Sequence, residues 1–175
     1  MRAGVFWSRF VVEAPGLAAS AEELWGSVLA LDRGEVTATG NVFVIAYLAT
    51  IRPDGSPRLH PFCPIISHGR LFAAIPPRSP KGDDLRRDGR CAIHALPGRD
   101  DLEMCIRAHA HEVTDAPTRD QILATVVRSG VTGMIATTRD HPLFEFDLVR
   151  VDVARWLDVG QEGTRAERQH WAAPD

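Results

Sequence analysis

Apolar residues recur at every second position over much of this chain, which is the period of a β-strand with one buried face. The clearest run covers residues 102–113, where apolar side chains alternate with polar and charged ones. Comparable segments, separated by turn residues, predict strands over residues 41–51, 57–66, 70–75, 90–96 and 143–157, and residues 163–171 could pair as a last short strand. Six or seven strands, mostly joined by short hairpins, indicate an antiparallel sheet.

Helical spacing replaces this alternation in segments that predict helices over residues 21–31, 80–88 and 118–129. Ser20 and Glu23 have the spacing of a capping box before the first of these helices, and Gly34 suits its end. Asp115-Ala116-Pro117 opens the third helix, after which residues 131–142 are expected to form a connecting loop.

Ser79 and Pro80 form a good helix start, because Ser caps a helix and Pro at the first helical position loses no hydrogen bond. Lys81, the only lysine in the chain, then lies in the first turn, among backbone amides that no helical carbonyl can satisfy. Such a turn attracts a phosphate or another anion. From these residues alone, an ordinary capped helix with a surface lysine remains the alternative.

Six or seven strands in one short chain favour closure, since a closed sheet has no exposed edge. We therefore predict a mainly β (α+β) fold: a closed six- to seven-stranded antiparallel barrel with two or three peripheral helices. At 175 residues the chain is expected to be a single domain. Within residues 1–175, residues 1–34 would be a helical lead-in, residues 41–158 the barrel and residues 159–175 a C-terminal tail.

Composition narrows the class of protein. A hydrophobic content of 45% and a charged content of 25% are ordinary for a globular domain. The net charge of −3 argues against nucleic acid as a partner, and no apolar run is long enough to span a membrane. The three cysteines, Cys63, Cys91 and Cys105, lack Cys-x-x-Cys spacing and look like small buried residues of a reducing compartment. We expect a cytoplasmic protein.

Three motifs occur in an order that resembles the pyridoxamine 5′-phosphate oxidase-like family of FMN-binding split β-barrels. They are the hairpin at residues 48–61, with Asp-Gly at its turn, the His-Gly-Arg-Leu turn at residues 68–71, and the Ser-Pro-Lys helix and following strand at residues 79–94. The resemblance implies a homodimer that binds FMN in a groove at the subunit interface. It also implies an oxidoreductase that moves a hydride or electrons to or from a small substrate, which the sequence does not identify.

The resemblance also implies which residues bind the cofactor. Residues that match Ser79 and Lys81 hold the phosphate, the strand that matches residues 60–63 runs along the flavin ring, and the end of the next strand lines the site. Arg87 follows Lys81 at a spacing that would keep it near the anion. The implied cofactor-binding residues are His60, Pro61, Phe62, Cys63, Ala74, Ile75, Ser79, Lys81 and Arg87. No catalytic residue can be named, and flavin hydride transfer needs no protein nucleophile.

Departures from the family pattern leave alternatives open. His60 stands where the true oxidases usually carry an arginine, and their substrate-binding Arg-x-His has only a superficial counterpart in residues 168–170. Arg58 shares the strand face of His60 and either reaches the phosphate or stays exposed. A deazaflavin coenzyme on the same fold would need further cations for its acidic tail, for which Arg78, Arg86 and Arg87 are candidates.

Histidines carry the two remaining alternatives. A non-catalytic flavin-binding or haem-binding protein is the rival of another class, and a haem would need an axial ligand such as His60, His94 or a C-terminal histidine. His109 and His111 share one strand face, which invites a metal site. Nothing in the spacing supplies the further ligands that a metal requires, so we predict no metal site.

Overall fold

The structure is a computed structural model that describes residues 6–35 and 44–174, and within them it contains eight strands and five α-helices. The strands are β1 (Ala46–Ile51), β2 (Pro57–Phe62), β3 (Ile65–Ser67), β4 (Arg70–Ala74), β5 (Arg90–Ala95), β6 (Glu103–Glu112), β7 (Leu143–Leu157) and β8 (Arg165–Ala172). The helices are α1 (Trp7–Glu13), α2 (Pro15–Arg33), α3 (Pro80–Arg87), α4 (Ala116–Val127) and α5 (Thr132–Asp140), with a short 3-10 turn, η1 (Arg99–Asp101). The predicted start of the first strand, at residues 41–43, lies outside the described residues.

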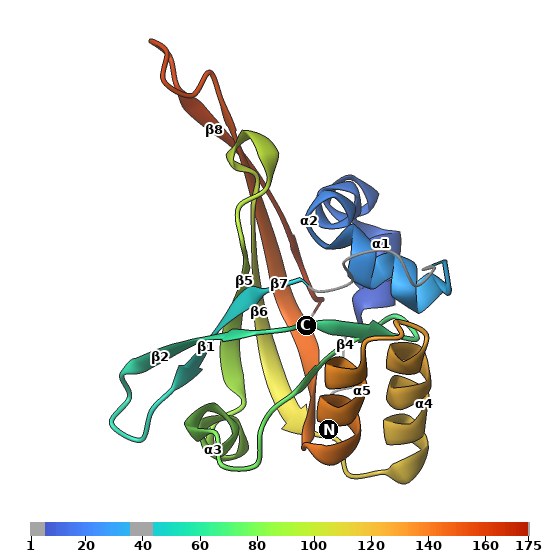
Figure 1. The fold of residues 1–175 in the computed structure, drawn as a ribbon. Helices are drawn as coiled ribbons and strands as arrows, with labels where there is room; N and C mark the ends of the chain where they lie inside the picture. Colours follow the sequence, from blue (N-terminus) through green and yellow to red (C-terminus); the bar gives the residue numbers. More distant parts are fainter. Residues whose placement is uncertain (1–5, 36–43, 175) are drawn as a thin grey trace.

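All strands belong to one antiparallel sheet (Figure 1). Seven of them form a continuous path in the order β2-β1-β5-β6-β7-β4-β3, and β8 pairs separately with β7. The long strand β7 makes this possible, because its first residues pair with β4 and its last residues pair with β8, while β6 follows its other edge.

The predicted closure of the barrel is wrong: the sheet is a strongly curled half-barrel. The two ends of the path, β2 and β3, are successive parts of the chain, separated only by Cys63 and Pro64, and no ladder joins them. Pro64, between the two strands, has no N–H to donate to such a ladder. The single strand predicted over residues 57–66 is therefore two strands.

Helices α1 and α2 cover the main hydrophobic core, on the face of the sheet that also receives Leu85 of α3. Trp7 of α1 stacks on Trp25 of α2 with 5.6 Å between ring centroids, and both are fully buried. Helix α2 begins at Pro15, so Ser20 lies inside it and the predicted capping box is wrong. Gly34 ends the helix with a positive φ of 75°, as predicted.

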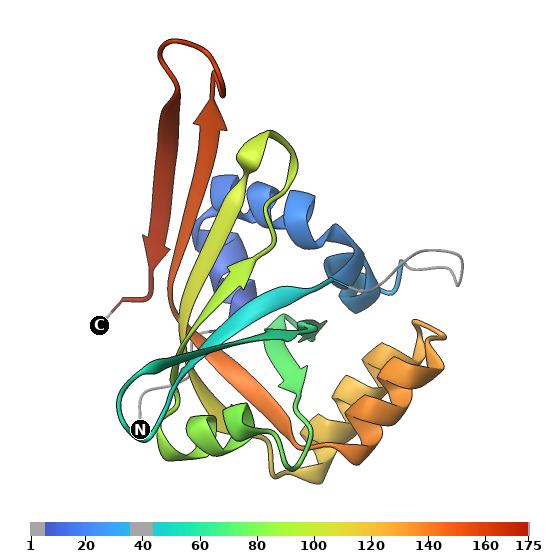
Figure 2. The same ribbon diagram turned by 60° about the vertical axis from the view of Figure 1, so that its left-hand side comes forward.

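Helices α4 and α5 lie side by side and pack on β3, β4 and the start of β7 (Figures 1 and 2). The second hydrophobic cluster joins Met134 of α5 and Ile122 of α4 to Phe72 of β4. Most of the segment 131–142, predicted to be a loop, thus forms helix α5. Its N-cap, Val131, makes no side-chain capping bond, so packing rather than a local signal supports this helix.

The last strand forms an arm with the end of β7 that projects beyond the rest of the sheet (Figure 2). The C-terminal segment therefore pairs as a last strand, which was one of the possibilities that its sequence left open. Trp171 anchors the base of the arm, because its indole N–H donates to Glu13 at 3.0 Å and its ring lies 5.5 Å from that of Phe10. Among the described helices, none is sufficiently long and apolar to cross a membrane.

Candidate functional site

The first turn of α3 presents free hydrogen-bond donors beside the edge strand β2. Ser79 is the N-cap and Pro80 the first helical residue, as predicted, but the Ser79 side chain makes no capping bond. The backbone carbonyl of Ser79 accepts from the backbone N–H of Gly82 at 2.8 Å. In the described part of the chain, neither the Ser79 hydroxyl nor the backbone N–H of Lys81 has a partner. Both are therefore available to an acceptor from outside the protein.

Lys81 extends from this turn to β2, where its Nζ donates to the carbonyl oxygen of Pro61 at 3.0 Å. The side chain is partly buried, and burial lowers the pKa of its ammonium. Lys81 forms no ion pair with any described residue. An exposed thiol, that of Cys63, lies close by; desolvation raises its pKa and outweighs the opposing attraction of Lys81. A partly desolvated cation without a counter-ion favours the arrival of an anion.

Two further basic residues of β2, Arg58 and His60, lie on the strand face that is turned toward α3, because strand side chains two apart share a face. The pKa of His60 is lowered, first by burial and then by the positive charges of Lys81, Arg58 and Arg52. These groups are therefore near enough to create a positive potential at the start of α3.

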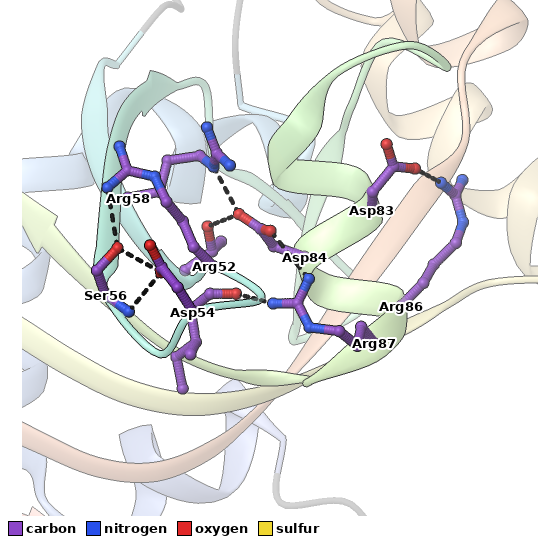
Figure 3. A network of polar contacts seen from close by, with 10 residues as sticks. Arg52, Asp54, Ser56, Arg58, Asp83, Asp84, Arg86 and Arg87 are labelled. Atoms are coloured by element: carbon purple, nitrogen blue, oxygen red, sulfur yellow. Dashed lines mark hydrogen bonds and ion pairs between the residues drawn. The ribbon is translucent and has the colours of Figure 1, made fainter.

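Asp84 holds the middle of α3 against this sheet edge (Figure 3). It is 2% exposed, and its carboxylate accepts from the Thr50 hydroxyl at 2.9 Å and from Arg58 Nε at 2.6 Å. Arg87 Nη1 donates to its other oxygen at 3.2 Å. Burial alone would raise the pKa of Asp84, but the three donors outweigh it, and the pKa is lowered. One buried carboxylate thus ties α3 to both β1 and β2.

The arginines at the end of α3 are bound to protein groups. Arg87 donates to Asp84 and to the carbonyl of Ile51. Arg86 Nε donates to Glu112 of β6 at 2.6 Å, and Asp83 lies 3.3 Å from its Nη1. These guanidinium groups neutralise carboxylates of the fold, and a ligand would have to compete for them.

The other predicted residues divide between backbone and side-chain roles. Phe62 is buried and its ring lies 6.0 Å from that of Phe146 in the core, so only its backbone could meet a cofactor. Ile75 is buried against the first turn of α3, where a Cβ on Gly82 would lie 3.4 Å from its side chain. Ala74 ends β4 with partial exposure. The structure brings Ser79, Lys81, His60, Pro61, Cys63 and Ile75 together, and their cofactor role stays a prediction.

A groove of about 470 Å³ that the sequence did not reveal lies on β1, β5 and β6, on the face of the sheet opposite to the hydrophobic core. Its floor contains the small side chains of Ala49 and Ala92, and His109 and Arg107 line it as well. A β-bulge between β6 and β7 leaves Val149 unpaired and half exposed at this groove. The sequence signal for this groove was the presence of alanines at outward-facing positions of neighbouring strands.

His111 lies between two carboxylates of β7: its Nε2 is 3.2 Å from Glu145 and its Nδ1 is 3.5 Å from Asp147. The hydrogen bond to Glu145 raises the pKa of His111. Arg70 completes this cluster, with Nε donating to Glu145 at 2.6 Å. The described residues contain no group of three or more ligands placed to hold a metal.

Comparison with known proteins found no matching family model and no match among curated proteins, but it found solved structures of the same fold. A protein of Clostridium acetobutylicum, related to general stress protein 26 of B. subtilis and assigned to the pyridoxinephosphate oxidase family, superposes with a TM-score of 0.56 at 9% identity over 94% of each chain. The haem storage protein HutZ of Vibrio cholerae has a TM-score of 0.57 at 12% identity, covering 91% of this chain and 93% of its own. An F420 reductase has a TM-score of 0.50 at 17% identity, covering 62% of this chain and 88% of its own.

This chain therefore has the pyridoxamine phosphate oxidase-like split-barrel fold, as its motifs predicted. The matched proteins differ in what they bind or do, and identities this low establish the fold alone. Flavin-dependent oxidoreductases share this fold with non-catalytic haem-binding proteins, so the function has to be argued from the site.

Proposed function

We propose that this protein is an FMN-binding oxidoreductase whose cofactor phosphate is held at the first turn of α3. The observation that carries the proposal is the Lys81 ammonium, partly buried and without a carboxylate partner among the described residues. The free Ser79 hydroxyl and the free Lys81 N–H lie in the same turn. A phosphate would satisfy all three donors and offset the cost of burying the charge.

Bound FMN would supply hydride or electron transfer to or from a small substrate, while the chain binds and orients the cofactor. The edge strand β2 offers backbone groups from His60 to Cys63 for the flavin ring, as the family resemblance implies. No described side chain is assigned a catalytic role.

A cofactor with one phosphate suits this site better than a deazaflavin coenzyme with a long acidic tail. Of the three arginines that could meet such a tail, Arg86 and Arg87 are already bound to carboxylates of the fold. Of these three, Arg78 is exposed and has no partner among the described residues. This distribution of charge supports FMN as the cofactor.

The same proposal includes a homodimer with the cofactor groove at the subunit interface. The uncovered face of β1 and β2 exposes Tyr47 and Leu59, the latter by 63%, and Ile45, Leu96 and Val149 are also exposed large apolar residues near this face. Exposed large apolar side chains gathered on one sheet face are typical of an interaction surface. A second copy of the chain would bury it. Light scattering should give the mass of a dimer, and a monomer at micromolar concentration would contradict this part of the proposal.

Titration of the purified apo-protein with FMN and with riboflavin tests the proposal, because the two differ only in the phosphate. We expect FMN to bind at least about tenfold more tightly than riboflavin, the increment of one charge-assisted phosphate contact. Lys81→Ala should remove most of this difference and leave the fold intact by circular dichroism. Equal affinity for FMN and riboflavin in the wild-type protein would refute the proposed phosphate site. Tighter binding of the deazaflavin coenzyme than of FMN would refute FMN as the cofactor.

A further inference from the structure

We infer that Arg58, held in place by Asp84, is a second side-chain ligand for the phosphate at the start of α3, and that Asp84 is its positioning residue. The inference rests on the proposed function and deepens it. The family resemblance did not place Arg58 in the site, and the sequence left it equally able to be an exposed strand residue.

The contacts of Arg58 leave most of its guanidinium free. Its Nε donates to Asp84 at 2.6 Å, and in the parts of the chain that the structure describes neither Nη group has a hydrogen-bond partner. A guanidinium has five N–H donors, so four remain for an anion. The side chain is 21% exposed, which gives a ligand access to it. Arg58 and Arg87 approach Asp84 from different sides (Figure 3).

Arg58 lies on the same side of β2 as Lys81. Its charge and that of Lys81 both lower the pKa of His60, which shares its strand face. Where the oxidases of this family usually carry an arginine, at position 60, this chain has a histidine. An arginine two residues earlier on the same face can supply the missing guanidinium.

Arg87 is the alternative arginine, and its contacts argue against it. Both of its Nη groups already donate to the protein, one to Asp84 and one to the Ile51 carbonyl. Moving Arg87 to a phosphate would leave that carbonyl without its donor, whereas Arg58 can use Nη groups that have no other partner. Asp84 fixes the Arg58 side chain before the anion arrives, and this reduces the conformational entropy lost on binding.

The test compares Arg58→Gln with Arg70→Gln, which breaks a similar pair elsewhere in the sheet. The Arg58–Asp84 pair has side-chain exposures of 21% and 2%, and the Arg70–Glu145 pair has 29% and 3%. We expect Arg58→Gln to reduce the ratio of FMN affinity to riboflavin affinity by about tenfold, while Arg70→Gln leaves it within about twofold. Both variants should lose stability, so stability alone cannot produce this difference. Arg58→Lys, which keeps the charge but not the fork, should restore part of the ratio.

Asp84→Asn separates positioning from simple electrostatics. Removing a negative charge near the phosphate would by itself tighten FMN binding, whereas a positioning role predicts weaker FMN binding with riboflavin unchanged. An unchanged affinity ratio in Arg58→Gln, or a loss confined to Arg87→Gln, would overturn the assignment.

Inorganic phosphate provides a readout that does not depend on flavin. The wild-type protein should gain thermal stability with increasing phosphate relative to chloride at equal ionic strength, and Arg58→Gln should lose most of that gain. If FMN fails to bind while this Arg58-dependent protection persists, the proposed function is wrong and the anion site stands. If phosphate protects both proteins equally, the role of Arg58 is refuted.

Discussion

Replacing Asp84 by Asn should destabilise the protein strongly, although Asn has nearly the same shape. The carboxylate is buried and accepts three hydrogen bonds, two of them from arginines. An Asn side chain keeps one acceptor, turns an NH₂ group toward a cation, and leaves Arg58 and Arg87 without their counter-charge. Breaking a buried ion pair by removing one partner costs about 3–5 kcal/mol. Because both arginines are partly exposed and can be rehydrated, we expect a loss of about 3 kcal/mol, at the lower end of that range.

Urea unfolding without added flavin, followed by the fluorescence of the buried tryptophans, would measure this loss. Asp83→Asn is the matched control, because Asp83 is the preceding residue of the same helix but is exposed, and among the described residues it pairs only with Arg86. That variant should change the free energy of unfolding by less than about 0.5 kcal/mol. A loss below about 1 kcal/mol for Asp84→Asn would refute the view that this carboxylate organises the site.

The difference in stability between the wild type and Asp84→Asn should also depend on pH. The pKa of Asp84 is lowered in the folded state, so its contribution is present above the unfolded pKa and lost as pH falls through the folded pKa. The difference in stability between wild type and Asp84→Asn should therefore be constant at neutral pH and shrink below about pH 4. A difference that kept its full size in acid would contradict the assigned ionisation.

The pKa of His111 is raised by Glu145, so its contribution to stability should be present below about pH 6.5 and be lost as pH rises through the folded pKa. Accordingly, His111→Gln should cost more stability at about pH 5.5 than at about pH 9, and equal costs in urea unfolding would refute this. Leu59→Asp should convert the proposed dimer to a monomer by placing a charge in the apolar face. Val12→Asp, at a position 79% exposed on α1, should keep the dimer mass in light scattering, and a dimeric Leu59→Asp would remove β2 from the interface.

Local signals predicted most of the elements. The alternation over residues 102–113 and the turns at Asp54-Gly55 and His68-Gly69 specify antiparallel strands, and the structure confirms these strands. Helix α5 was missed because it has no side-chain cap, and its apolar residues pack on α4 and on distant strands of the sheet. Such an element becomes recognisable only when its partners are in place.

For the candidate site, too, the sequence predicted the local features and missed the contacts between distant residues. Ser79, Pro80 and Lys81 carry a local signal, since a helix start leaves free amides wherever it occurs. The partnership of Arg58 with Asp84 spans 26 residues, and no spacing rule relates them. Arg87 was favoured from its spacing along α3, but that spacing also places it beside Asp84 and the Ile51 carbonyl.

By itself, the sequence determined most of the strands, the turns and the start of α3, because these depend on neighbours within a few residues, and its motifs resembled those of one fold family. Only the tertiary structure decided that the sheet stays open between β2 and β3, and which N–H groups of the arginines are already bound to protein groups. The physical reason is that ion pairing and desolvation depend on groups brought together from distant parts of the chain. A cationic side chain can bind a ligand only through N–H donors that the fold has left without a partner.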